Sequence, residues 1–228
     1  YSDFISSEGV PVFYARVDHV SVPLAKEGTG QVVVDFTPEP LTQDVSFVFH
    51  IEKTADVVVD SLTAEISGIP STMELTTGLI LAQKTYKLLF RPTYAALPSA
   101  ADSASAEALR CEASVNIPGI VRSHTEDMVT GPGILQIAIY THYDYEEEGT
   151  QRKAAKVFHA GINLYHTLKE RKSLQWDEEE NGYRQASRSI TVEIGSPLNI
   201  DKDGILNGGS TSTGLDQWIP GETFEIEV

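Results

Sequence analysis

The sequence predicts an all-β protein built from antiparallel β-sandwiches, with one or two short helices. Apolar residues recur at every second position in several segments, which is the period of a half-buried strand and not of a helix. Turns rich in glycine, proline and asparagine, such as Gly131-Pro-Gly133, separate these segments at short intervals. No helical pattern is long enough to provide the crossover connections that a parallel sheet needs.

Length and composition are those of a chain that folds. Its 228 residues are 41% hydrophobic and 22% charged, and a chain of this size can bury a core without disulfides or metals. The 33 acidic and 17 basic residues give a net charge of −16, so the chain lacks the dense basic face that nucleic-acid phosphates require. No apolar run approaches the ~20 residues of a membrane-spanning helix.

Two segments show the strand pattern most clearly. Residues 44–51 place Val45, Phe47, Phe49 and Ile51 on one face. Residues 133–142 likewise place Leu135, Ile137 and Ile139 on one face of a strand. Further strands are expected at residues 12–22, 31–37, 57–66, 84–91, 111–117, 155–164 and 189–194.

The last expected strand is residues 223–228. Its alternation directs Phe224, Ile226 and Val228 toward a core and leaves acidic residues on the wet face. As the final strand of the chain it is either an intact strand of the second sandwich, the interpretation we favour, or a strand donated to a neighbouring subunit.

Two segments depart from the strand pattern. Residues 100–110 are rich in alanine and are expected to form a linker or a short helix. Their central position suggests a domain boundary, which gives two β-sandwich domains at residues 1–105 and 106–228. Residues 163–174 are expected to contain one to three helical turns, because Leu164 and Leu168 lie four apart and basic residues gather near the end.

Catalytic signatures are absent from the sequence. No Gly-x-Ser-x-Gly turn, phosphate-binding loop or dinucleotide fingerprint occurs, so no catalytic residue and no cofactor are assigned, and the expected role is non-enzymatic. A hydrolase with an unrecognised pair of carboxylates remains a minor alternative.

The candidate metal ligands have no metal-binding spacing. Among the six histidines, only His142 and His159 are placed to face each other across a hairpin, and ordinary polar strand positions are the favoured interpretation. Asp201-Lys-Asp203-Gly204 begins like a calcium loop, but Ile205 stands at a ligand position, so calcium near Asp201 stays open. No metal site is therefore assigned. The runs Glu146–Glu148 and Asp177–Glu180 are expected to be solvated loop tips.

Aromatic residues give one candidate ligand contact. Tyr140, Tyr143 and Tyr145 surround an expected hairpin, where their rings could stack on a sugar, although tyrosine is also common on the outer face of strands. Trp176 and Trp218 are expected to close the ends of a sandwich. Cys111, the single cysteine, is expected to be buried and cannot form an internal disulfide.

Three passages resemble the fimbrillin-like cell-surface proteins of Bacteroidales, the type V pilus proteins, and among them the pilus-anchoring subunits. The first is Ser61-Leu-Thr-Ala-Glu-Ile-Ser-Gly-Ile-Pro-Ser-Thr-Met-Glu-Leu-Thr-Thr-Gly78, which is similar to a phrase of that family's first domain. The second is Ile162-Asn-Leu-Tyr-His-Thr-Leu168, similar to a strand that leads into a helical turn. The third is Gly214-Leu-Asp-Gln-Trp-Ile-Pro-Gly221, similar to the family's closing turn before its final strand.

The resemblance implies two transthyretin-like sandwiches in tandem and a role as a fimbrial anchor or accessory subunit in pilus assembly and adhesion. It implies export as a lipoprotein to the outer membrane and cell surface, with a lipidated cysteine upstream of Tyr1. Partners would be other pilus subunits, joined through strand addition, and the isolated protein would be a monomer. Arg16 lies inside an expected strand, which favours an anchor over a shaft subunit cleaved after a basic residue. The alternative function is a carbohydrate-binding surface module of a glycan-uptake system.

Overall fold

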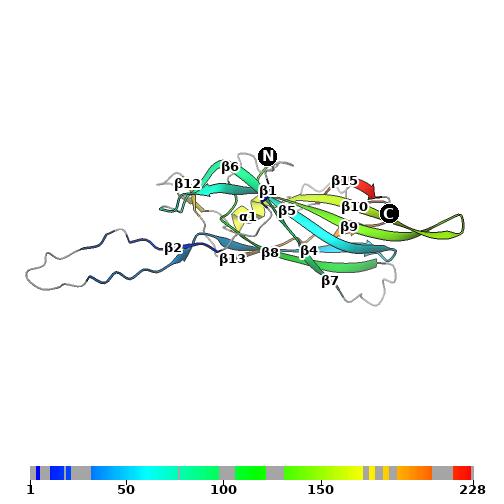
Figure 1. Ribbon diagram of the computed structural model, residues 1–228, viewed down its shortest axis with the longest axis horizontal. Helices are drawn as coiled ribbons and strands as arrows, with labels where there is room; N and C mark the ends of the chain where they lie inside the picture. Colours follow the sequence, from blue (N-terminus) through cyan, green and yellow to red (C-terminus); the bar gives the residue numbers. More distant parts are fainter. Residues whose placement is uncertain are drawn as a thin grey trace, which may run out of the picture.

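The computed structural model describes residues 4–5, 11–17, 19–21, 32–76, 78–97, 106–121, 131–171, 175–177, 182–184, 189–206 and 218–226. Strands dominate these residues (Figure 1). They are β1 (Phe4–Ile5), β2 (Phe13–Tyr14), β3 (Glu39–Pro40), β4 (Gln43–Thr54), β5 (Val57–Met73), β6 (Ile80–Phe90), β7 (Thr93–Ala96), β8 (Ala106–Ile117), β9 (Ile134–Glu147), β10 (Thr150–Asn163), β11 (Gln175–Asp177), β12 (Gly182–Arg184), β13 (Ser189–Glu193), β14 (Leu198–Ile200) and β15 (Ile219–Ile226). The helix is α1 (Tyr165–Glu170).

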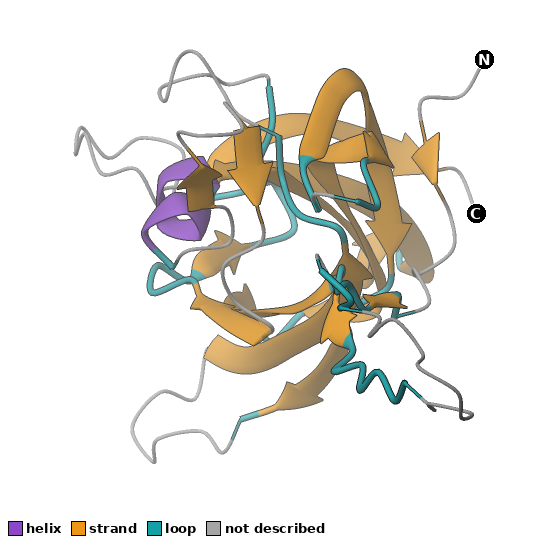
Figure 2. Cartoon of the chain, turned by 90° about the vertical axis from the view of Figure 1, so that its left-hand side faces the viewer, coloured by secondary structure: helices purple, strands orange, loops and turns teal. Residues whose placement is uncertain are grey.

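Two sheets pack face to face as a β-sandwich, which confirms the all-β prediction (Figure 2). The large sheet has the order β11-β12-β6-β5-β9-β10-β15, with β1 beside β6. The small sheet has the order β13-β4-β8-β7, with β14 beside β4. Phe47 of β4 stacks on Phe90 of β6 with ring centroids 5.7 Å apart, so the aromatic core joins the two sheets.

Both halves of the sequence contribute to both sheets. Strand β4 pairs with β8 along its whole length, and β5 pairs with β9, although residue 105 lies between the members of each pair. The buried side chains, from Val45 to Trp218, form one continuous core. The described strands therefore form one sandwich in place of two in tandem. The alternation of side chains in β4 and β5 specifies which face of each strand is apolar. It does not specify which distant strand pairs with each of them.

Strand direction also differs from the expectation. Most neighbours are antiparallel, but β13 and β14 run parallel to β4, and β1 runs parallel to β6. A tight turn forces two consecutive strands to be antiparallel, whereas strands this far apart in the sequence have no such constraint.

The two predicted helical segments have different outcomes. Helix α1 lies inside residues 163–174 as expected, and it buries Tyr165 and Leu168 against the core. In residues 100–110, however, β8 begins at Ala106, and residues 100–105 lie outside the described part of the chain. Pairing with β4 outweighs the helical propensity of the alanines in this segment. In the described part of the chain, no helix is both long and apolar enough to cross a membrane.

A glycine junction connects β5, β9 and α1. The Gly133 amide donates to the Ser67 carbonyl at 3.0 Å, and the Leu164 amide donates to the Gly133 carbonyl at 2.8 Å. Gly68 and Gly133 adopt φ angles of +84° and +79°, which residues with side chains rarely adopt. Both lie against neighbouring backbone, so the junction depends on their missing side chains.

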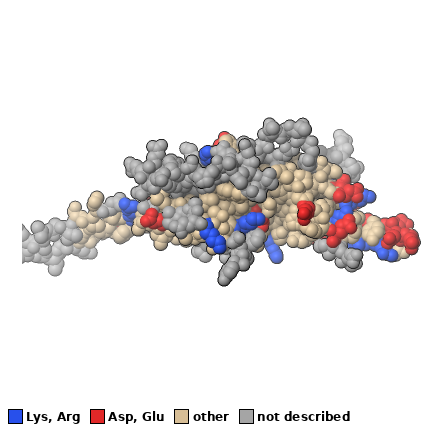
Figure 3. All heavy atoms as spheres, turned by 90° about the horizontal axis from the view of Figure 1, so that it is seen from above, with Lys and Arg blue, Asp and Glu red and all other residues tan. Residues whose placement is uncertain are grey.

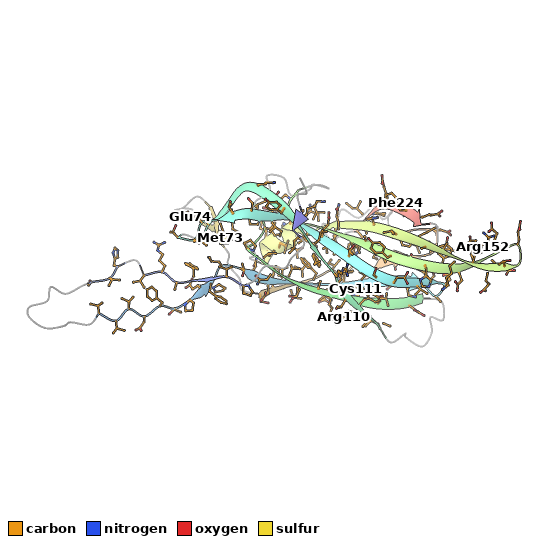
Figure 4. All side chains as sticks on the ribbon, in the orientation of Figure 1. Met73, Glu74, Arg110, Cys111, Arg152 and Phe224 are labelled. Atoms are coloured by element: carbon orange, nitrogen blue, oxygen red, sulfur yellow. The ribbon has the colours of Figure 1, made fainter. Side chains whose placement is uncertain are left out.

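Cys111 lies between the sheets and is fully buried, while its neighbour Arg110 points outward (Figure 4). Burial raises the pKa of the Cys111 thiol from 9.0 to about 12. We expect the native protein to leave a thiol reagent such as DTNB unreacted, and the unfolded protein to react with it, because only the thiolate is nucleophilic. Release of one thiol equivalent from the native protein would contradict this.

The same shift predicts a pH dependence of stability. Between pH 9.0 and about 12 the unfolded thiol is deprotonated while the native thiol keeps its proton. The unfolded state then binds fewer protons, so the free energy of unfolding falls as pH rises through this range. Below pH 9.0 the Cys111 thiol keeps its proton in both states, and its contribution to the free energy of unfolding is at its full value. Urea midpoints measured across this range should decline less steeply in Cys111→Ala than in the parent protein.

Candidate functional site

A projecting arm, made up of the described residues 11–17, 19–21 and 32–40, extends from one end of the sandwich (Figure 1, blue segment at left). At its base β2 pairs with β3, with Phe13 opposite Pro40 and Tyr14 opposite Glu39. The Arg16 guanidinium donates to the Thr76 carbonyl at 2.9 Å and holds the arm against the turn between β5 and β6. Residues 15–17, 19–21 and 32–38 lie outside any strand, so Arg16 is exposed and not inside the expected strand, and its position no longer favours an anchor over a cleaved shaft subunit.

The strands expected at residues 12–22 and 31–37 are therefore wrong, apart from the two residues of β2. Residue 18 and residues 22–31 lie outside the described part of the chain. The alternation of valines is present, but a strand also needs a partner for its backbone, and the structure provides one only at the base of the arm.

Apolar side chains of the arm face solvent. None of its described residues is buried, and only Tyr14, Val34 and Pro40 are half-buried. The exposed large apolar residues are Val12, Phe13, Val17, Val20, Val32, Val33 and Phe36. Monomeric proteins rarely expose apolar residues in such a continuous group, and an isolated two-stranded ribbon has too little core to be stable in water. The described residues of the arm therefore form an exposed apolar surface.

Charge is distributed unevenly along the molecule. The described arm residues include only Arg16, Asp35 and Glu39 as charged side chains at neutral pH. Figure 3 shows a dense group of acidic and basic side chains at the opposite end, where the β9–β10 hairpin ends. Glu147 and Arg152 form an ion pair of 2.9 Å there. The described part of the arm therefore presents mainly apolar side chains, with one basic and two acidic residues among them.

Strand β15 ends the order of the large sheet. One of its edges pairs with β10, and Phe224 is 52% exposed on its outward face. The expectation that Phe224 points into the core is therefore wrong, while the side chains of Ile226 and Val228 lie outside the described part of the chain. Residues 221–225 of β15 are all exposed, so this part of the edge strand buries neither face, and the alternation in the sequence does not mark a buried one.

The three candidate tyrosines do not form one surface. Strand β9 continues to Glu147, so Tyr143 and Tyr145 share a face, with ring centroids 6.3 Å apart, and Tyr140 lies on the opposite face. Tyr143 contacts the Lys156 ammonium at 5.3 Å from its ring centroid. The hairpin turn falls at Glu148 and Gly149, both with positive φ, and Gly149 is the sequence signal that marks it.

The histidines lie apart from one another. His142 pairs with Ala155 across the hairpin and bonds the Asp60 carboxylate at 2.7 Å, while His159 contacts the Phe224 ring. No group of three candidate metal ligands occurs among the described residues. His124 lies outside them, as do Glu178, Glu179 and Glu180.

The loop at Asp201–Gly204, which begins like a calcium site, uses the Asp201 carboxylate for hydrogen bonds within the loop. Asp201 accepts hydrogen bonds from the amides of Asp203 and Gly204, at 2.7 and 2.8 Å. The Lys202 carbonyl accepts a bond from the Lys156 ammonium at 2.8 Å, so the loop is fixed to β10. Asp201 thus stabilises a turn.

Trp218 closes part of the core as expected. It is buried, meets the edge of Phe49 at 5.8 Å, and its indole nitrogen donates to the Ser196 carbonyl at 3.0 Å. The side chain of Trp176 lies outside the described part of the structure.

Comparison with known proteins gives one distant structural likeness. No protein-family model and no curated protein sequence matches the chain. A solved structure of a candidate adhesin from Bacteroides ovatus is similar, with 11% sequence identity and a TM-score of 0.41. The match covers 88% of this chain and 61% of that one, so the chain spans less than two thirds of the solved structure's length.

Proposed function

We propose that the protein is a structural and adhesive subunit of a bacterial surface filament, with the role of an anchor or accessory subunit. The projecting arm is the observation that supports this most directly. Its apolar side chains are exposed and its backbone is extended, and an extended segment of this kind gains main-chain hydrogen bonds and side-chain contacts when it pairs with another subunit.

Composition and resemblance support the same role. The described residues of the arm carry only one basic and two acidic side chains, so they add little to the electrostatic repulsion that a protein of net charge −16 exerts on an acidic partner. Three sequence passages resemble pilus-anchoring subunits. In this proposal a lipidated cysteine upstream of Tyr1 attaches the protein to the outer membrane, and the isolated chain is monomeric.

Site-specific photocrosslinking tests the role of the arm. Phe36, which is 61% exposed, is replaced by p-benzoylphenylalanine in cells that assemble the filament. Leu206, which is 60% exposed and lies outside the arm, is the matched control position. We expect Phe36 to crosslink to another subunit of the same filament and Leu206 to give little of that product. Equal products from both positions, or none from Phe36, would exclude the arm as the joining segment.

A charge substitution separates assembly from folding. We expect Phe36→Asp to change the free energy of unfolding by less than about 0.5 kcal/mol, because the side chain is exposed. Its incorporation into the filament should fall, because a carboxylate would have to be buried at the contact. Thermal unfolding of the purified variant and its amount in the filament fraction measure the two effects. Normal incorporation would count against the proposal.

A further inference from the structure

A cavity of about 350 Å³ lies on the outward face of the large sheet, over β9, β10 and β15. Gln136, His159 and Gly161 are at least partly exposed on this face, whereas their direct neighbours Leu135, Ile137, Phe158, Ala160 and Ile162 are buried toward the core. The volume lies at the lower end of the range of small-molecule sites in proteins, which is roughly 300 to 1,000 Å³. The arm is not part of the cavity, so the site is separate from the surface proposed above for assembly.

Gly161 forms the floor of the cavity. It pairs with Gln136 of β9 and Ile219 of β15, in the interior of the sheet. Its φ lies outside the left-handed range, and an added Cβ would make ordinary contacts, 3.6 Å from Gln136 Cγ. Neither the backbone nor the available space therefore requires glycine. The hollow exists because a side chain is missing at this position, as occurs where a ligand approaches a strand closely.

One wall of the cavity is built by the β-bulge. Two residues of β15, Gly221 and Glu222, oppose the single residue His159 of β10. A Cβ at Gly221 would lie 2.9 Å from His159 Cβ, so this glycine allows the imidazole its position. The His159 ring meets Phe224 edge to face, with centroids 5.6 Å apart and an interplanar angle of 88°. The bulge thus places an aromatic pair beside the hollow (Figure 4 labels Phe224).

Polar groups stand around the apolar floor and wall. The Gln136 amide oxygen accepts from the Lys87 ammonium at 3.4 Å, and Asn163 accepts from the Tyr165 amide at 2.9 Å. Glu222 is exposed at the bulge. No lysine or arginine lines the cavity among the described residues, and the nearby Lys87 ammonium is already ion-paired with Glu65, so a phosphate or carboxylate ligand would find little counter-charge.

This combination fits a neutral sugar ring. The apolar face of a pyranose packs on an aromatic side chain, while its hydroxyls bond amides and carboxylates such as those of Gln136 and Glu222. We propose that the Gly161 cavity binds one residue of a neutral glycan. The tyrosines Tyr140, Tyr143 and Tyr145 are not part of this site, since the residues that line it lie around Gly161 and Phe224.

Backbone amide NMR with neutral methyl glycosides of glucose, galactose, mannose and N-acetylglucosamine tests the proposal. We expect at least one glycoside to shift the amide signals of Gly161 and Gly221. Gly161→Val should fill the hollow and weaken binding by about tenfold or more. Gly195→Val is the matched control, because an added Cβ there meets nothing within 4 Å. Both variants should fold, since an added Cβ has room at each position and valine is favoured at Gly161, which lies in β10, while Gly195 lies outside any strand.

Three results would overturn the proposal. They are an absence of shifts with every glycoside, equal binding by the parent protein and Gly161→Val, or shifts produced only by a short apolar peptide. The last result would assign the cavity to a protein partner. Crosslinking from Phe36 in the Gly161→Val variant should remain normal, so failure of glycan binding can be distinguished from failure of the proposed role of the arm.

Discussion

Phe49→Ala is expected to lower the free energy of unfolding by about 3 to 5 kcal/mol, because it removes a fully buried ring from a close-packed core. Phe49 lies in β4, which pairs with β8 and packs beneath the large sheet. Its ring also meets Trp218, a residue more than 160 positions later in the sequence. The loss should therefore affect the sandwich as a whole.

Urea denaturation followed by tryptophan fluorescence and by circular dichroism measures this effect. In one shared sandwich both signals should move together to a lower midpoint, in a single transition. Phe36→Ala is the matched control, since it removes the same ring from the exposed arm and should cost less than about 0.5 kcal/mol. Two separate transitions, with the tryptophan signal unchanged, would instead indicate two independent tandem domains.

Gly68→Ala is expected to cost about 3 kcal/mol or more, because two penalties combine at one residue. A φ of +84° is unfavourable for alanine, and the new Cβ would lie 2.3 Å from Pro132 Cβ and 2.5 Å from Pro132 Cα. Relieving this overlap would move the chain entering β9 and strain the hydrogen bond from Gly133 to Ser67. The junction of β5, β9 and α1 would loosen as a result.

Gly149→Ala separates the two penalties. Its φ of +78° is nearly the same, but nothing lies within 4 Å of the added Cβ. Gly149→Ala should therefore lower the free energy of unfolding by only about 1 to 2 kcal/mol, because only the backbone conformation is unfavourable for alanine. Urea midpoints of the two variants give the comparison. Equal losses at Gly68 and Gly149 would show that the close approach of Pro132 adds nothing.

The sequence was sufficient to predict local features. Val45, Phe47, Phe49 and Ile51 are all fully buried, as their alternation predicts. The short helix within residues 163–174 is also confirmed. In these segments the period of the side chains is set by the backbone itself, so the buried face can be read without knowing the partner strand.

The candidate sites were less predictable. The tyrosines were expected around a hairpin, but the turn lies at Gly149, so all three stand in β9, where alternation places Tyr140 on the opposite face from Tyr143. The Gly161 cavity was missed, although a glycine inside an apolar strand is a recognisable signal. Phe224 was assigned to the core because alternation alone cannot show that residues 221–225 of this edge strand are all exposed.

By itself, the sequence determined the all-β class, the apolar faces of the long strands and the absence of known catalytic motifs. Only the tertiary structure decided that β4 and β5 pair with β8 and β9, that the described residues within 11–40 form a projecting arm, and that Gly161 opens a cavity. The physical reason is that the buried side chains of one strand repeat every two residues, which the sequence of that strand shows. The choice of the neighbouring strand depends instead on contacts between distant segments, and the free energy of those contacts is decided by the whole fold.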